Sequence, residues 1–337
     1  METVTIKDIA KALNLSTSTV SRALRDSYEI NPETKRLVLD YAEKVNYHPN
    51  PIAQGLKENR SGAIGVIVPE IANHYFSQAI SGIEAVAYAR GYHVVIFQSQ
   101  ESYEREVVNS RYLAARKVDG LLISLSSSTV DVSHLKELHE KGLPLVFFDR
   151  VAETIETSKV VADNFLGTFE ATEHLILSGR RCIAHMAGSP TLSITQERLA
   201  GYRSALDRHG IAYEEDLVHY CTSGLEEIAG IVSCLVSRSP RPDALLTCTD
   251  RLALGSLSEL RKNGIRIPQD MSFAGFSNLQ GADLLNPSLT TVVQPAFEMG
   301  QTAASLLLEI IDKKNKNVSY RTLKLPTRLI VRESSML

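Results

Sequence analysis

Apolar residues recur at helical spacing near the start of the chain and predict two short helices joined by a tight turn. The first helix opens with a capping box, in which Thr5 is followed three positions later by Asp8, and its apolar face continues to Leu13. The second helix is capped by Ser16 and ends near Leu24. Two helices of this length and spacing are typical of a helix-turn-helix unit.

The second of these helices has a polar face that suits contact with DNA. Ser18, Ser21, Arg22 and Arg25 share this face, opposite the apolar positions. Short hydroxyl groups near a helix N-terminus can reach base edges and phosphates, and the guanidinium fork of Arg22 matches the O6 and N7 atoms of guanine. A small helical hairpin with a solvated Ser/Arg face is the alternative interpretation.

A third helix and a weaker helical segment follow. Asn31 and Pro32 have the residue types of an N-cap and a first helical position, and an apolar stripe runs on to Val45. The next segment, 52–58, contains Gly55, which costs a helix about 1 kcal/mol. Because so short a helix is not stable alone, we expect this segment to order only against a partner. A flexible linker is the alternative interpretation.

From residue 63 onward, short β-branched runs alternate with helical stretches. This alternation indicates parallel sheets with right-handed crossovers, and the continuous apolarity of the first run indicates burial on both faces. The pattern repeats in two halves, with a change near 160–163. The predicted strands are AIGVIVP, HVVIFQS, GLLISL, PLVFFD, CIAHMAG, ALLTCT, MSFAGF and TTVVQP.

Composition and motifs limit the possible functions. The 337 residues, of which 44% are hydrophobic and 22% charged, suffice for two or three domains with buried cores. No GxGxxG sequence follows the first strand, and there is no Walker loop, GxSxG elbow or HExxH pair, so we expect neither an enzyme nor a cofactor. No apolar stretch approaches the roughly 18 residues that span a bilayer, and no signal peptide is apparent. We therefore expect a cytoplasmic protein that does not bind membranes.

Cysteine spacing and charge narrow the possibilities further. The four cysteines lack the spacing of metal ligands and are interpreted as free thiols, so no metal site is expected. Residues 1–60 hold 9 Lys or Arg and 8 Asp or Glu, a net charge of +1. The net charge of the whole chain is −3, so residues 61–337 carry −4. DNA binding must therefore depend on a few well-placed cations. The cysteines are Cys182, Cys221, Cys234 and Cys248.

The first sixty residues resemble the DNA-binding headpiece and hinge of the lactose repressor (LacI/GalR) family. The similarity lies in TIKDIAKALNLSTSTVSRAL and INPETKRLVLDYAEKVNYHPNPIAQGL. The implied base contacts are Thr17, Ser18 and Arg22, and the implied phosphate contacts are Thr19, Ser21 and Asn50. In this family the hinge helix enters the minor groove, where a leucine wedges between base pairs. The matching hinge residues are Ile52, Ala53 and Leu56.

The remainder resembles the two-lobed, periplasmic-binding-protein-like (type I) body of the same family. The expected fold is thus an all-α helix-turn-helix headpiece followed by an α/β body with parallel sheets. The expected domains are a headpiece at 1–48, a hinge at 49–61 and a body at 62–337, with crossovers between the lobes near 161, 291 and 323. The N-terminal lobe is expected to comprise 62–161 and 292–322, and the C-terminal lobe 162–290 and 324–337.

Candidate effector-binding residues cluster at strand ends, where open α/β sheets bind ligands. The strand-end candidates are His74, Tyr75 and Phe76 in the loop after the first strand, Asp149 and Asn164; the resemblance adds Arg198, Asp250, Ser277 and Gln294. Purely structural roles are the alternatives. They are core packing for Tyr75 or Phe76, turn capping for Asp149, capping of a helix that starts near Gly167 for Asn164, a surface salt bridge for Arg198 and N-capping for Asp250.

One candidate departs from the pattern of the family. Many members carry paired acids after the aromatic residue of this strand, whereas this chain has Ser277 and Asn278 after Phe276. Loss of the carboxylate predicts a polar, uncharged contact with the effector at Ser277. The effectors of better-known relatives therefore do not transfer directly to this chain.

These features together predict a transcription repressor controlled by a small molecule. The chain ends at Leu337 without leucine heptads, so a homodimer on a pseudo-palindromic operator is expected, with half-sites about one helical turn apart. The expected effector is a sugar or sugar derivative, with a purine or nucleoside as the alternative. A sugar-binding transport protein has a similar body but needs a signal peptide and lacks residues 1–60. In some members a phosphocarrier protein is a co-regulator.

Overall fold

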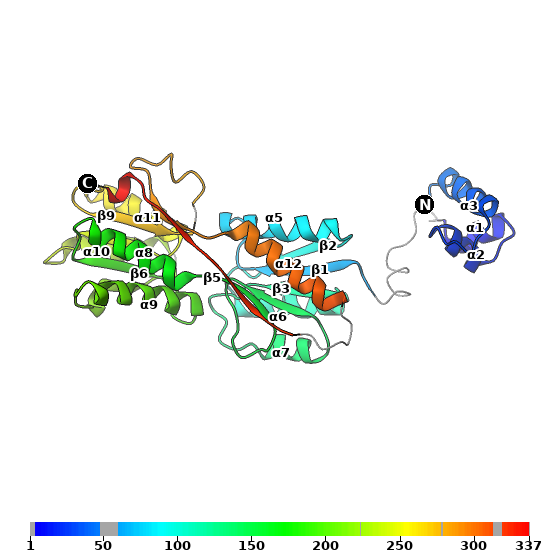
Figure 1. Cartoon of the computed structure of the whole chain (residues 1–337), viewed down its shortest axis with the longest axis horizontal. Coiled ribbons are helices and arrows are strands. Elements are labelled where there is room, and N and C mark those ends of the chain that lie inside the picture. Colours follow the sequence, from blue (N-terminus) through cyan, green and yellow to red (C-terminus); the bar gives the residue numbers. More distant parts are fainter. Residues whose placement is uncertain (1–3, 48–59, 223, 278, 313–318, 337) are drawn as a thin grey trace. The chain divides into compact units, whose positions relative to one another are not determined.

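The computed structural model describes residues 4–47, 60–222, 224–277, 279–312 and 319–336, which divide into one unit within 1–61 and a second within 62–337. The first unit contains the three predicted helices, α1 (Ile6–Ala12), α2 (Thr17–Ala23) and α3 (Pro32–Lys44) (Figure 1). The side chains buried between them are Ile9, Ala10, Val20, Ala23, Val38 and Ala42. The prediction of a small all-α headpiece is confirmed.

Local side-chain hydrogen bonds place the ends of these helices. The amide of Thr5 donates to the Asp8 carboxylate at 2.9 Å, as expected of the capping box. Ser16 Oγ accepts from the amide of Thr19 at 3.0 Å, and Asn31 Oδ1 accepts from the amide of Glu33 at 2.8 Å. These bonds satisfy amides that have no partner inside a helix.

The second unit is built on two six-stranded sheets, one in each lobe. The N-terminal sheet has the order β11-β5-β4-β3-β1-β2 and the C-terminal sheet the order β12-β10-β9-β8-β6-β7. All strand pairs are parallel except β10 with β12. The N-terminal strands are β1 (Ala63–Val68), β2 (His93–Gln98), β3 (Gly120–Ile123), β4 (Leu145–Phe148), β5 (Ser158–Ala162) and β11 (Thr322–Leu325). The C-terminal strands are β6 (Ile183–Ala187), β7 (Val218–Tyr220), β8 (Ala244–Thr247), β9 (Ser272–Phe276), β10 (Thr290–Val293) and β12 (Arg328–Ile330).

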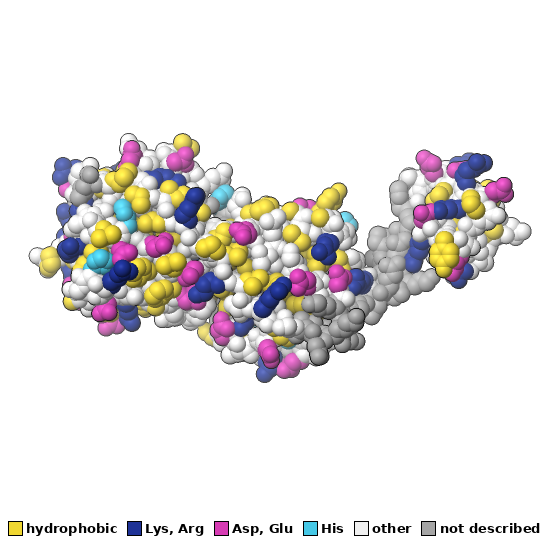
Figure 2. Space-filling model, viewed as in Figure 1, with side chains coloured by type: hydrophobic (Ala, Val, Ile, Leu, Met, Phe, Trp, Pro, Cys, Tyr) yellow, Lys and Arg dark blue, Asp and Glu magenta, His cyan; other side chains and the backbone are white. Residues whose placement is uncertain are grey.

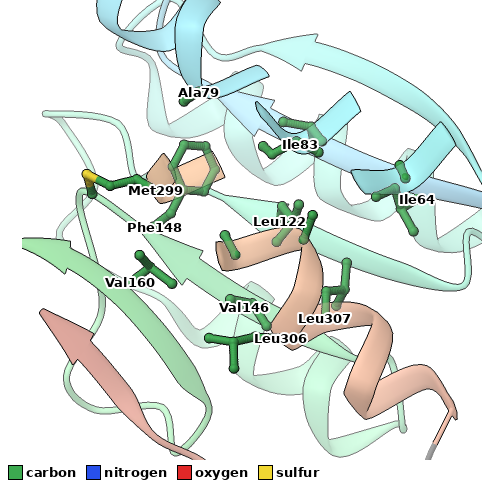
Figure 3. Close-up of a cluster of buried hydrophobic side chains, with 14 of the residues drawn as sticks. Ile64, Ala79, Ile83, Leu122, Val146, Phe148, Val160, Met299, Leu306 and Leu307 are labelled. Atoms are coloured by element: carbon green, nitrogen blue, oxygen red, sulfur yellow. The ribbon is translucent and has the colours of Figure 1, made fainter. Parts of the chain in front are cut away.

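Helices cover both faces of each sheet, as the continuous apolar strands require. The helices of the N-terminal lobe are α5 (His74–Ala89), α6 (Tyr103–Ala115), α7 (Ser133–Glu140) and α12 (Ala296–Asp312). Those of the C-terminal lobe are α8 (Asn164–Leu177), α9 (Ser193–Arg208), α10 (Leu225–Ser237) and α11 (Asp250–Lys262), with short 3-10 turns at Glu215–Leu217 and Glu333–Ser335. Figure 3 shows the core beneath α5 and α12, where Leu306 and Leu307 of α12 lie over Leu122 and Val146 of the sheet.

The chain crosses between the lobes three times, slightly later than predicted. β5, β10 and β11 continue to Ala162, Val293 and Leu325 before the chain leaves each sheet. The predicted crossovers near 161, 291 and 323 therefore precede these strand ends by one or two residues, because each strand completes its backbone pairing before the chain leaves the sheet. Residues 292–293 lie in the C-terminal sheet and 324–325 in the N-terminal sheet. The short edge strands β7, β11 and β12 were not predicted, because they lack a buried apolar run. The buried strand β5 was also not predicted, because it begins with Ser158 and Lys159.

Helices α5 and α12 pack with their backbones in contact at two glycines. A Cβ atom on Gly82 would lie 2.0 Å from the carbonyl oxygen of Phe297, and one on Gly300 would lie 2.0 Å from that of Ala79. Neither carbonyl belongs to a flexible side chain, so neither can move without shifting a helix. Glycine at these positions permits the close crossing of α5 and α12.

We expect Gly300→Ala to lower the free energy of unfolding of the body by about 3 kcal/mol, because the added methyl group meets backbone in a packed interface. The measurement is urea denaturation followed by circular dichroism. Gly230→Ala is the matched control, since it lies within α10 and a Cβ there meets no atom within 4 Å. That variant should gain up to about 1 kcal/mol from helix propensity. Equal effects of the two substitutions would contradict the close-crossing explanation.

Candidate binding sites for DNA and effector

Arg198 is buried at the centre of the candidate effector site. This side chain on α9 is only 3% exposed, so the predicted alternative of a surface salt bridge is wrong. Its Nε and Nη2 atoms donate to Oδ1 of Asn164 at 3.0 and 2.8 Å, and Nη1 donates to the carbonyl of Cys248 at 2.6 Å. Its guanidinium carbon lies 3.8 Å from the ring centroid of Phe276. Burial lowers the pKa of Arg198, but a guanidinium remains charged at any physiological pH.

Asn164 holds the guanidinium group of Arg198 in place. Asn164 is the first residue of α8, and Asp163 is the cap, since its Oδ1 accepts from the amide of Leu166 at 3.1 Å. The expected helix start near Gly167 was therefore three residues late, because the cap is the acid that precedes Asn164. The amide nitrogen of Asn164 donates to the carbonyl of Ala162 and to Glu197. Both polar atoms of the Asn164 side chain, Oδ1 and Nδ2, therefore form hydrogen bonds within the protein.

A chain of hydrogen bonds joins the two lobes through Gln294. Asp149 follows β4, and its Oδ1 accepts from Nε2 of Gln294 at 3.4 Å. Ser277 follows β9, and its hydroxyl group donates to Oε1 of Gln294 at 3.1 Å. Gln294 itself lies at the crossing between β10 and α12. Asp149 and Ser277 both have left-handed backbone conformations, with φ of 61° and 112°, which are uncommon outside glycine and frequent at functional sites.

The aromatic candidates lie in the first turn of α5 rather than in a loop. Asn73 caps this helix, because its Oδ1 accepts from the amide of Tyr75 at 2.9 Å. Tyr75 and Phe76 are buried edge to face, with ring centroids 5.2 Å apart, whereas His74 is half-buried. The hydroxyl group of Tyr75 donates to the sulfur of Met299 at 3.3 Å. Burial and then the charge of Asp149 raise the pKa of Tyr75, so this hydroxyl group stays protonated.

Asp250 has an unused acceptor atom beside this cluster. It is the first residue of α11, and Thr249 is the N-cap, since its hydroxyl oxygen accepts from the amide of Leu252 at 3.2 Å. The alternative role of Asp250 as a cap is therefore wrong. Among the residues that the structure describes, none forms a hydrogen bond with its buried Oδ1 atom. Burial raises the pKa of Asp250 to about 7, although a hydrogen bond with the backbone of Leu279 and the charge of Arg198 both lower it.

Two residues that the sequence analysis missed extend the cluster towards the lobe interface. Arg150 follows Asp149 directly, lies 5.8 Å from the ring centroid of Phe76 and donates from Nη1 to the Glu101 carboxylate at 2.9 and 3.0 Å. Its Nε atom is buried without a partner among the described residues. The position directly after a strand, from which Asp149 was predicted, could also have indicated Arg150. No sequence signal marked Glu101, which is 49 residues away in the chain.

Glu101 also holds the loop that contacts the opposite lobe. Its carboxylate accepts from the amide of Ser127 at 2.7 Å. The carbonyl of Ser127 in turn accepts from the hydroxyl groups of Ser189 at 3.3 Å and Thr191 at 2.9 Å, which belong to the C-terminal lobe. A continuous set of contacts therefore runs from Phe76 and Arg150 to the facing lobe.

In the helical unit, α2 carries the candidate DNA contacts on its surface. Thr17, Ser18 and Arg22 are exposed, and Thr19 and Ser21 are half-buried. Hydrogen bonds between Ser16 Oγ and the hydroxyl groups of Ser18 and Thr19, 2.7 and 2.8 Å long, fix the first turn of the helix. The remaining predicted contacts fall outside the described residues: Asn50, Ile52, Ala53 and Leu56.

A helix-turn-helix unit followed by a two-lobed α/β body with polar groups gathered between its lobes defines a transcription regulator with its own small-molecule sensor. The model for bacterial regulatory proteins of the lacI family matches residues 5–50, and the model for periplasmic binding proteins and the sugar binding domain of the LacI family matches residues 61–333. The chain belongs to the LacI family. It is therefore an effector-controlled DNA-binding regulator and not an enzyme.

Named relatives and solved structures are similar to this chain over almost its whole length. The repressor PurR of Vibrio campbellii is 31% identical over 330 residues, which are 98% of each protein. The ribose operon repressor of Haemophilus influenzae is 33% identical over 333 residues, again 98% of each. The lac repressor dimer bound to operator and anti-inducer superposes with a TM-score of 0.87 at 25% identity and covers all of both chains. The complex of the regulator CelR with cellobiose gives a TM-score of 0.75 at 30% identity, over 98% of this chain and 99% of that one.

Two further features of the described residues bear on the remaining expectations. None of their helices is long and apolar enough to cross a membrane. The same part of the chain brings together no group of three or more His, Cys, Asp or Glu side chains that could hold a metal ion.

Proposed function

We propose that this protein is a dimeric repressor whose effector is a sugar or sugar derivative bound between the lobes. The observation that carries this proposal is the buried Arg198, held by neutral groups and flanked by the acceptors Asp149 and Asp250. A sugar hydroxyl both donates and accepts, so it suits a site that presents guanidinium donors beside carboxylate acceptors. Phe76 and Tyr75 are buried in the core of the N-terminal lobe, and we propose that they form the apolar floor beneath a sugar ring. His74, Asn164, Ser277 and Gln294 complete the proposed site, with Asn164 as the residue that orients Arg198.

A purine or nucleoside is the second candidate effector. Several of the relatives are named PurR, and they are about as similar to this chain as the ribose repressors are. A purine ring also presents donors and acceptors and stacks on aromatic side chains. Ser277, where many family members have an acid, offers a neutral hydroxyl group that can donate to or accept from either a sugar hydroxyl or a purine ring nitrogen, so the ligand panel has to separate the two candidates.

The DNA-binding part of the proposal combines the surface of α2 with the hinge. We assign base contacts to Thr17, Ser18 and Arg22, phosphate contacts to Thr19, Ser21 and Asn50, and minor-groove contacts to Ile52, Ala53 and Leu56. The exposure of the α2 side chains supports the first two sets, whereas the contacts at 50–56 rest on the sequence alone. We propose a pseudo-palindromic operator, and because DNA is the partner we place the protein in the cytoplasm.

Exposed apolar side chains support association of two copies. β2 lies at the edge of the N-terminal sheet, and its Val95 and Ile96 are each 38% exposed. In the C-terminal lobe, Leu225 on α10 and Leu254 on α11 are also exposed. An exposed edge strand with apolar side chains favours pairing with another chain. We propose that these surfaces form the homodimer interface, in accordance with the lac repressor dimer to which this chain is similar.

We propose that Arg150, Glu101 and Ser127 couple the effector to closure of the lobes. An effector that contacts Arg150 changes its ion pair with Glu101, and Glu101 positions the carbonyl of Ser127 that accepts from Ser189 and Thr191. Closure then alters the distance between the two hinge segments of a dimer. A coupling of this kind requires different contacts in the open and closed states.

Glu101→Gln should reduce this coupling. The amide keeps the shape but loses the charge that holds Arg150 and the amide of Ser127. We expect the ratio of operator affinities with and without effector to fall by about 10-fold, within the usual range of allosteric coupling. The measurement is fluorescence anisotropy of labelled operator at saturating effector. Glu84→Gln, which removes an exposed charge from α5, is the control. An unchanged ratio in Glu101→Gln would rule out the relay.

One experiment tests the proposed function as a whole. Operator sequences are selected from random duplex DNA with the purified protein, and gel-shift titrations are then run with panels of sugars, sugar phosphates and purines. A sugar that changes operator affinity and raises the melting temperature supports the proposal, whereas the same response to a purine alone selects the second candidate. Failure to select any palindromic sequence would contradict the repressor function.

A further inference from the structure

An ion pair joins the proposed recognition arginine to an acid in the following loop. Nη1 of Arg22 lies 3.2 Å from Oε2 of Glu29, and the two side chains are 58% and 48% exposed. Both side chains therefore remain accessible on the surface of the helical unit. Glu29 is not among the residues predicted from the sequence to contact DNA.

The backbone between α2 and α3 sets the position of Glu29. The loop folds back on α2, since the amide of Ser27 donates to the carbonyl of Arg22 at 3.1 Å. The amide of Glu29 then donates to the hydroxyl oxygen of Ser27 at 3.3 Å, and the amide of Ile30 donates to its carbonyl at 3.3 Å. A second ion pair, between Lys35 of α3 and Asp26, holds the start of the same loop. The backbone position of Glu29 next to Arg22 is thus fixed by a hydrogen-bonded turn.

The pair leaves half of the arginine fork available. Glu29 binds at Nη1, so the edge formed by Nε and Nη2 still offers two parallel donors. Two parallel donors are what guanine O6 and N7 require. At the same time the carboxylate offsets the charge of Arg22, which reduces its attraction to phosphates. This matters in a unit whose net charge is only +1, and Figure 2 shows acidic side chains beside basic ones on its visible face.

We propose that Glu29 is a positioning residue for Arg22, which makes this arginine selective for guanine over the phosphate backbone. On the operator, the ion pair persists and presents the Nε–Nη2 edge to guanine in a fixed orientation. On random DNA, the same ion pair weakens the electrostatic attraction of Arg22 to the phosphates. This inference rests on the proposed base contact of Arg22.

The test uses the full-length protein with Glu29→Gln and a random-sequence 30-bp duplex. Each phosphate that is newly neutralised steepens the slope of log affinity against log salt by about 0.9, so two freed arginines in a dimer should steepen it by about 2. We expect the affinity for random DNA to rise by about 10-fold at 0.1 M salt. Affinity for the selected operator should change by less than about 3-fold, so that discrimination falls. The penalty for replacing the guanine read by Arg22 should also shrink.

Two controls separate this role from bulk charge. Glu43→Gln removes the same charge from the exposed end of α3, and in the Arg22→Ala background Glu29→Gln has no arginine to release. Neither comparison should steepen the salt slope. If Glu43→Gln matches Glu29→Gln, or if the guanine penalty is unchanged, the inference is overturned. If Arg22→Ala keeps full operator affinity, the proposed base contact fails instead.

Discussion

Arg22→Ala should weaken binding to the selected operator by about a thousandfold. A bidentate contact between arginine and guanine contributes about 2 kcal/mol of discrimination, and a dimer makes two such contacts, so about 4 kcal/mol is lost. Random DNA should lose much less affinity, because Glu29 already offsets the charge of Arg22. The measurement is fluorescence anisotropy with both duplexes at fixed salt.

The control for this variant is Arg36→Ala, which removes one exposed cation from α3 of the same unit. It should weaken operator and random DNA by similar, small factors, since it acts through charge alone. Because the Arg22 side chain is largely exposed, its removal should leave the melting temperature of the helical unit nearly unchanged. Equal losses for Arg22→Ala and Arg36→Ala on the operator would contradict the recognition role of α2.

Arg198→Met should abolish the response to effector. The substitution removes the guanidinium donors proposed to bind the ligand and leaves Asn164 Oδ1 and the carbonyl of Cys248 without their present donors. We expect effector affinity to fall at least about 100-fold, since a charged hydrogen-bonded contact in a buried site contributes about 3 kcal/mol or more. The measurement is isothermal titration calorimetry with the effector found in the ligand screen.

Destabilisation has to be separated from loss of binding in this variant. The unsatisfied polar groups should lower the free energy of unfolding of the body by about 2 kcal/mol. Arg198→Lys keeps the charge but not the fork, so it should fold better and still bind effector poorly. Arg203→Met on the same helix is the control, because Arg203 is exposed and stacks on Tyr213 at 4.1 Å. A folded Arg198→Lys variant with full effector affinity would remove Arg198 from the site.

The sequence predicted the secondary structure well wherever the cause is local. Thr5 with Asp8, Ser16 and Asn31 cap the three helices through bonds that span two or three residues. Most central strands were predicted because burial on both faces requires runs of apolar residues, but β5 was missed, because only its last three residues are apolar. The edge strands β11 and β12 have partly exposed side chains, so the same criterion missed them. The lobe crossings were predicted too early for a related reason: strand length depends on the partner strand.

In the candidate site, too, some residues were predicted from the sequence, whereas their contacts depend on the tertiary structure. Asp149 was predicted from its place after a strand, and Arg198 from the resemblance to a family. That Arg198 is buried against Asn164 and Phe276 depends on the packing of α8, α9 and β9. Arg150 with Glu101, and Arg22 with Glu29, are pairs that no local pattern marks, because oppositely charged residues at arbitrary separation occur throughout any chain.

The sequence by itself therefore determined the class of protein, a helix-turn-helix headpiece with a two-lobed sensor, together with the exposed face of α2 and the strand-end members of the candidate effector site. These follow from caps, periodicity and strand ends, which act over a few residues. Only the tertiary structure decided which charges meet, where the chain changes lobes, and how Arg150 is linked to the opposite lobe. Such contacts arise when the packing of apolar faces brings distant segments together, and side-chain hydrogen bonds then select among the polar groups within reach.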